Sequence, residues 1–178
     1  MPATRYRTFA GYNRWANTRL YEAAARLSPE QYRADRGAFF HSVHGTLNHI
    51  LVADRIWLRR FTGSGDVAAS LDATLFVELA DLARARETED ARIIAFTESL
   101  DEAALATEFS YTNSSGARFE QRLDTALDHF FNHQTHHRGQ AHALLTHFLG
   151  NAATPSLDLI AFQREIAAFC SAAKTRKG

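Results

Sequence analysis

Histidines are concentrated late in the sequence, where six of the nine lie between His129 and His147. The same segment carries apolar residues at helical spacing, so we predict a helix with an inward stripe about 120° wide. His137 points along the middle of that stripe, and His133 lies at its edge. Imidazoles four residues apart stack on one helix face with Cβ atoms about 5–6 Å apart, so both can reach one metal ion. The stripe consists of Leu123, Ala126, Leu127, Phe130, Ala141, Leu144, Leu145 and Phe148.

His129 extends this pair into a ladder at intervals of four residues. His129 and His137 are about 12 Å apart along a helix axis, whereas zinc–imidazole bonds are about 2.0–2.1 Å long. One adjacent pair can therefore share an ion, and a third ligand must come from another helix. Gln140 lies nearly in line with His133 and is predicted either to orient a ligand or contact a bound molecule, or to be an exposed amide. Surface or boundary roles are predicted for His136, His142 and His147.

Three histidines in or near a predicted helix at 42–61 are candidates for the third ligand, namely His41, His44 and His49. Helical periodicity alone does not choose among them. Asp54 falls among leucines on the same helix, about 140° around from His49, so it is not expected to share an ion with that histidine. A buried carboxylate needs a cationic or hydrogen-bonding partner. The candidates for this partner are Arg55, Arg59 and Arg138.

The periodicity predicts an all-α protein, a four-helix bundle with a short extra C-terminal helix and a small hairpin or extended loop before the fourth helix. We interpret residues 1–178 as a single domain. The charged middle of the third helix, residues 84–92, is predicted to be a solvated face with local ion pairs. The main helices are expected at about 6–25, 42–61, 75–100 and 121–148, the hairpin at 108–120, and the extra helix from Ser156 or Asp158 through Phe169.

The composition narrows the class of partner. Twenty basic side chains balance twenty acidic ones, so the chain has no overall positive field for binding nucleic acid. No apolar run is long enough to span a membrane, and the amino terminus has no apolar block like that of a signal peptide. Cys170 is the only cysteine, which excludes an internal disulfide and is compatible with a reducing cytosol. We therefore expect a cytoplasmic protein.

Three segments together resemble the DinB/YfiT-like family of bacterial metal-binding four-helix bundles. They are Tyr-Asn-Arg-Trp-Ala-Asn at 12–17, Leu-Asn-His-Ile-Leu at 47–51 followed by Trp-Leu at 57–58, and His-Gln-Thr-His-His-Arg-Gly-Gln at 133–140. The resemblance covers nearly the whole chain. It implies that His49 joins His133 and His137 around a divalent ion, with zinc or nickel as the leading candidates and iron as a further one. It also implies a homodimer.

Within the wider superfamily some members are thiol transferases that use low-molecular-weight thiols, and others resemble metal-dependent hydrolases or isomerases. Three neutral imidazoles leave a coordination position open for water or substrate. We therefore expect a metal-dependent enzyme that activates a thiol or water for attack on a small electrophile, that is, a thiol S-transferase or a hydrolase. The alternative is a non-enzymatic, stress-associated interaction protein that binds metal. The sequence assigns no catalytic residue and no general base.

Overall fold

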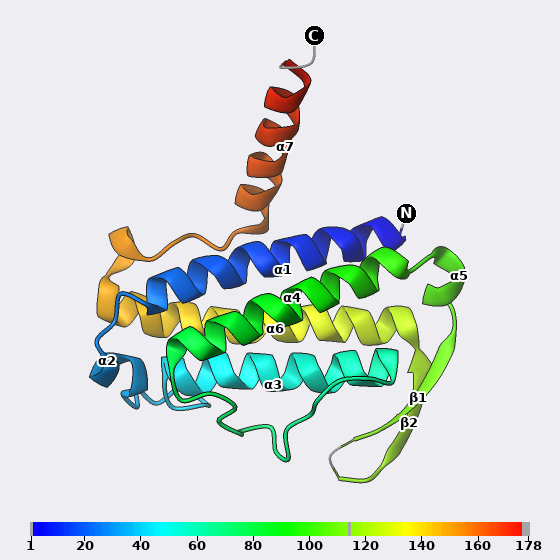
Figure 1. The fold of residues 1–178 in the computed structure, drawn as a ribbon, viewed down its shortest axis with the longest axis horizontal. Helices are drawn as coiled ribbons and strands as arrows, with labels where there is room; N and C mark the ends of the chain where they lie inside the picture. Colours follow the sequence, from blue (N-terminus) through cyan, green and yellow to red (C-terminus); the bar gives the residue numbers. More distant parts are fainter. Residues whose placement is uncertain (1, 114, 176–178) are drawn as a thin grey trace.

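A computed structural model describes residues 2–113 and 115–175. Four long helices lie side by side and form a bundle, as predicted (Figure 1). α3 and α4 run in one direction and α1 and α6 in the other, because the link of residues 63–78 returns along the bundle before α4 begins (Figure 1). The four helices are α1 (Pro2–Ala24), α3 (Val43–Thr62), α4 (Leu79–Ser99) and α6 (Leu123–Leu149).

Shorter elements join these helices. The predicted hairpin is present before the last bundle helix, formed by the antiparallel strands β1 (Glu108–Thr112) and β2 (Arg118–Arg122). The sequence did not predict the short helices α2 (Pro29–Arg33) and α5 (Glu102–Leu105) or the 3₁₀ turn η1 (Asn151–Ala153). No helix in the described ranges is long and apolar enough to cross a bilayer.

The predicted additional helix, α7 (Leu159–Thr175), runs beyond Phe169 and projects away from the bundle (Figure 1). Its first turns are attached to α1 by Phe162, whose ring packs on Tyr12 and Trp15, and by Glu165, which accepts a hydrogen bond from the Trp15 indole. The side chain of Cys170 lies outside the part of the chain that the structure describes.

Local sequence signals set the ends of α3, which carries one of the candidate ligands. Ser42 caps the amino terminus by accepting a hydrogen bond from the Gly45 amide. Gly63 ends the helix with a φ of 74°, a left-handed conformation that glycine adopts without steric cost. These two residues explain why the predicted boundaries, 42–61, agree closely with the observed helix.

Among the described residues, the two largest apolar clusters lie within the bundle, one toward each end. One cluster contains Leu20, Leu47, Leu51, Leu82 and Leu145, and the other contains Tyr6, Leu58, Ile93, Leu127 and Phe130. Between them, all four helices contribute buried polar side chains. We call this set the polar layer; it consists of Asn13, Asn17, Asp54, Arg86, Asp90, Gln134 and Arg138.

Arg86 of α4 is the centre of the polar layer. Its guanidinium lies 2.6 Å from a carboxylate oxygen of Asp54 on α3 and 3.0 Å from one of Asp90 on α4. Asn17 of α1 donates to Asp90, and Gln134 of α6 donates to Asp54 at 2.8 Å. Buried charges are tolerated only when they are paired and hydrogen-bonded, so this arrangement fixes the positions of the four helices relative to one another.

Two expectations about charge differ from the structure. The middle of α4 was expected to be a solvated face with local ion pairs. The local pairs are present, between Arg86 and Asp90 and between Arg92 and Glu89, but Arg86, Glu89 and Asp90 are only 2%, 2% and 3% exposed. Arg86 also replaces the three arginines proposed as partners of Asp54, none of which forms an ion pair with it among the described residues. Arg86, Glu89 and Asp90 each have one partner on α4 and at least one on another helix. The charge pattern of a single helix identifies only the partners within that helix.

Arg86→Met would leave Asp54 and Asp90 buried without their cation. We expect this variant to lower the free energy of unfolding by about 3–5 kcal/mol, the usual cost of breaking a buried ion pair. Urea denaturation followed by circular dichroism measures it. The matched control is Arg84→Met, which removes an exposed arginine paired with Asp81 on the same helix and should change stability by less than about 1 kcal/mol. Equal effects in the two variants would contradict the role given to Arg86.

Candidate metal centre

Three histidines from two neighbouring helices converge at the level of the polar layer. His49 comes from α3, and His133 and His137 come from successive turns of α6. One ring nitrogen from each lies within 4.8 Å of the others. The ring centroids of His133 and His137 are 4.3 Å apart, and those of His49 and His137 are 4.4 Å apart. The helical pair and the partner that the family resemblance implied are therefore close enough to share one ion.

Hydrogen bonds determine which nitrogen faces the cluster in two of the three rings, those of His49 and His137. The Leu71 carbonyl lies 2.8 Å from Nδ1 of His49. A carbonyl only accepts, so Nδ1 carries the proton and Nε2 presents its lone pair. In His137, Nδ1 donates to Oε1 of Gln140 at 2.8 Å, which leaves the Nε2 lone pair free in the same way. A carbonyl partner on the remote nitrogen is the arrangement usual for histidines that bind metal.

The Nε2 atoms of His49 and His137 face each other at 3.2 Å. With both protons on the opposite nitrogens, two lone pairs point at one another, and this repulsion is relieved by a cation between them. Burial lowers the pKa of His49 to about 4 and that of His133 to about 3, and it also lowers the pKa of His137. The three rings are thus neutral at physiological pH, as metal ligands must be. The donor set fits a divalent ion.

One side of the cluster is closed by apolar and backbone groups. The ring of Phe40 stacks on His49, with centroids 3.7 Å apart and an interplanar angle of 15°, and meets His137 edge-on. Asn48 holds the link of residues 63–78 in place, because its side-chain oxygen accepts from the amides of Leu75 and Phe76. This positions the carbonyl that orients His49.

The other side opens into a cleft of about 690 Å³ between α3, the link and the hairpin. His49 and His133 lie in its wall, together with His129. The Trp57 ring packs 5.1 Å from that of His129, which in turn lies 5.8 Å from His133. A small molecule in this cleft would therefore reach the histidine cluster along a wall of rings.

The remaining histidines lie elsewhere. His41 pairs with Asp35 at the surface. His44 bonds to the Phe76 carbonyl. His136 is exposed and contacts Gln140, and His147 is exposed as well.

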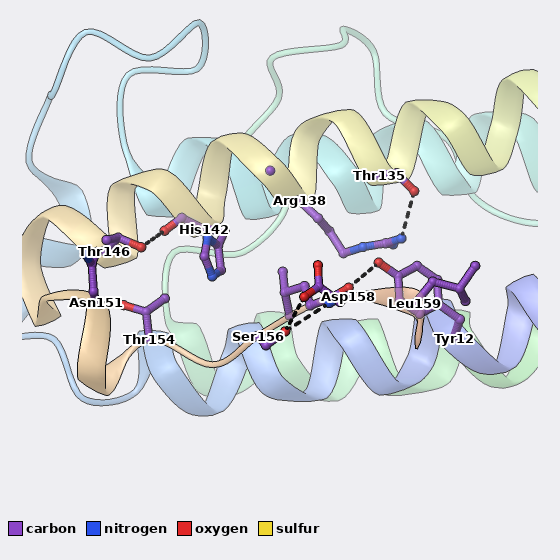
Figure 2. A pocket seen from close by; sticks show the side chains of 12 residues that line it. Tyr12, Thr135, Arg138, His142, Thr146, Asn151, Thr154, Ser156, Asp158 and Leu159 are labelled. Atoms are coloured by element: carbon purple, nitrogen blue, oxygen red, sulfur yellow. Dashed lines mark hydrogen bonds between the residues drawn. The ribbon is translucent and has the colours of Figure 1, made fainter. Parts of the chain in front are cut away.

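A second cavity, of about 680 Å³, lies on another side of α6. Figure 2 shows His142 directed into it toward the segment after α6, and its Nε2 lies 2.9 Å from the Pro155 carbonyl. Arg138 extends from the same helix toward Thr135 and Tyr12 (Figure 2). Neither side chain belongs to the histidine cluster.

Sequence reasoning missed several supporting residues. Gln134 lies one position after a candidate ligand, yet it is buried in the polar layer. Arg138 was named only as a candidate partner of Asp54; it is buried as well, and it donates to Asn13 and Thr135. Nothing in the sequence pattern pointed to Phe40 or to the Leu71 carbonyl, since both come from irregular segments. Gln140, predicted to orient a ligand or contact a bound molecule, hydrogen-bonds His137.

Comparison with known proteins agrees with these features. A family model described as the DinB family matches residues 1–165, a range that contains all three histidines. The chain is also similar to a curated protein named Protein DinB from Bacillus subtilis (strain 168), with 27% identity over 151 residues. That match covers 82% of this chain and 86% of the relative.

Metal content tests the histidine cluster directly. We expect untagged wild-type protein to retain a stoichiometric divalent ion, and His49→Ala and His137→Ala to lose it, because two imidazoles hold an ion far less tightly than three. Elemental analysis by mass spectrometry makes the measurement. His147→Ala, an exposed histidine on α6, is the control and should keep the wild-type content. Equal metal content in all four proteins would contradict the assignment.

Gln140→Leu tests how His137 is oriented. Loss of the acceptor at Nδ1 should weaken divalent-ion affinity about 10–100-fold, the usual effect of removing a partner of a ligating histidine. Competition with a chelating indicator measures the affinity. Gln140→Glu keeps an acceptor at this position and should bind nearly as tightly as wild type. Unchanged affinity in Gln140→Leu would show that this hydrogen bond does not orient the ring.

Proposed function

The chain belongs to the DinB family, and we propose that it binds a divalent ion through His49, His133 and His137 and acts as a metal-dependent enzyme. The observation that most directly supports this is that the Nε2 atoms of His49 and His137 face each other at 3.2 Å, beside an open cleft. Three imidazoles leave a coordination position free, as in catalytic zinc sites. Zinc and nickel are the leading candidates, and iron is a further one, since imidazole suits all three.

The proposed substrate is a small electrophile. A divalent ion held by these histidines would supply Lewis-acid activation of a thiol or of water near neutral pH. With a low-molecular-weight thiol the reaction is S-transfer, and with water it is hydrolysis. In either case the attacking group releases its proton to solvent, its sulfur or oxygen forms a bond to the electrophilic carbon, and the leaving group departs with its electron pair.

The protein's own groups have separate tasks in this proposal. The Leu71 carbonyl and Gln140 keep two ligand rings in the required tautomer. Phe40 covers one side of the cluster and excludes water there. The cleft admits the substrate from the other side. Among the described residues that line the cleft there is no carboxylate, so we assign no general base.

The competing function is that of a non-enzymatic, stress-associated interaction protein in which the ion mainly stabilises the bundle. One observation favours it: the three histidines join α3 to α6, so a bound ion would connect two helices of the fold. In both cases we propose a cytoplasmic protein, which the single cysteine fits, and a homodimer, which stays a prediction.

Activity and stability measurements on one variant separate the two functions. For an enzyme, His137→Ala should lower kcat/KM at least about a hundredfold while the far-ultraviolet circular dichroism spectrum is unchanged, because Lewis-acid assistance is worth several kcal/mol. Suitable assays are conjugation of cysteine with chlorodinitrobenzene for S-transfer and cleavage of nitrophenyl acetate for hydrolysis. His147→Ala should keep full activity.

A structural ion predicts another pattern. His137→Ala would then lower the melting temperature, and neither assay would detect metal-dependent turnover in the wild-type protein. That outcome would favour the interaction protein over the enzyme.

A further inference from the structure

The cleft beside the histidine cluster carries a local positive charge. Its described lining residues include Arg59 and Arg60 but neither aspartate nor glutamate. The chain as a whole has equal numbers of acidic and basic side chains. The excess of positive charge is therefore a property of this cleft and not of the whole chain. A cleft lined by charge of one sign concentrates ligands of the opposite sign.

Arg60 is held in a defined orientation. The central carbon of its guanidinium lies 4.6 Å from the centre of the Trp57 ring and 4.8 Å from that of Tyr111. These contacts fix the planar group between α3 and the hairpin. Its one hydrogen bond among the described residues goes to the Thr112 carbonyl at 3.3 Å. A guanidinium has five N–H donors, so most of them are unused by the protein.

No carboxylate of the described chain neutralises either arginine. Arg59 donates only to the Gly65 carbonyl, and neither arginine forms an ion pair within the described ranges. Asp66 and Asp72 lie next to lining residues of the link, but both are exposed and neither lies in the cleft wall. Desolvation lowers the pKa of Arg60, because no carboxylate nearby offsets the cost of partly burying its charge.

The part of the cleft wall that the link supplies is mainly apolar, whereas the hairpin adds the polar side chains Ser110, Thr112 and Asn113. Val67 and Leu71 of the link expose 46% and 47% of their surface, and both line the cleft with Ile56 of α3. A ligand that buried this surface would gain about 25 cal/mol for each Å² removed from water. The cleft thus joins an apolar wall to a rigid cation.

We infer that this cleft binds a small organic anion, with its acidic head group on the guanidinium of Arg60 and its apolar body on the link, so that its reactive end lies near His133. The inference depends on the proposed function only in taking the cleft as the substrate's route to the histidine cluster. Arg59, at the cleft rim, adds long-range attraction, and Arg60 makes the direct contact. An electrophile or thiol that carries a carboxylate is therefore preferred over its neutral analogue.

Isothermal titration calorimetry with matched probes tests this inference on the full-length protein. The probes are phenylpropionate and its neutral isostere phenylpropanamide. We expect wild-type protein to bind the anion about tenfold more tightly than the amide, as one charge-assisted contact would give. Arg60→Gln should reduce this preference to near unity. If Arg60 had only a structural role, its loss would weaken both probes alike and leave the ratio unchanged.

Further variants and metal removal complete the test. Arg14→Gln removes an exposed arginine of α1, outside the cleft wall, and should keep the wild-type preference, whereas Arg60→Lys should keep part of it.

Protein stripped of metal by a chelator should still prefer the anion. A preference that disappears with the metal but survives in Arg60→Gln would place the carboxylate on the ion and overturn the inference. Absence of anion binding to wild type at millimolar concentration would overturn it too. An anion preference without metal content or turnover would sustain it while the proposed function failed.

Discussion

The polar layer is the constraint on which the rest of the bundle depends. Two buried carboxylates, Asp54 and Asp90, share the guanidinium of Arg86, and each of the four long helices supplies at least one member of the layer. Apolar side chains tolerate small shifts of one helix past another, but hydrogen-bonded charges do not, because an unpaired buried charge is strongly destabilising. The two apolar clusters supply stabilisation, and the layer between them specifies how the helices align.

That alignment also brings the histidines together. Gln134, between His133 and His137 on α6, donates to Asp54, which lies five residues after His49 on α3. One hydrogen bond therefore fixes α3 and α6 beside the point where their imidazoles meet. The candidate metal centre and the charge network occupy different faces of α3 and α6, and the rigidity of the network holds the Nε2 atoms of His49 and His137 at a short separation.

The surroundings of the cluster are asymmetric, and this asymmetry is why we propose a catalytic ion and not a purely structural one. Phe40 covers one side, whereas the cleft, which the link helps to line, reaches His49 and His133 from the other. A closed structural site needs no approach of this size. The cleft also contains an oriented guanidinium at Arg60 and apolar side chains of the link. In the proposed function, the groups that select the ligand are therefore separate from the histidines that hold the ion.

The sequence by itself determined the four long helices, the hairpin, and the inward pair His133 and His137, because periodicity and capping are local properties of the chain. It left the third ligand open until the family resemblance selected His49, and it misread the charges of α4 as solvated. Only the tertiary structure paired Arg86 with Asp54 and brought Phe40 over the cluster. Those contacts join residues far apart in the chain, and a pattern within one helix carries no information about the helix that packs against it.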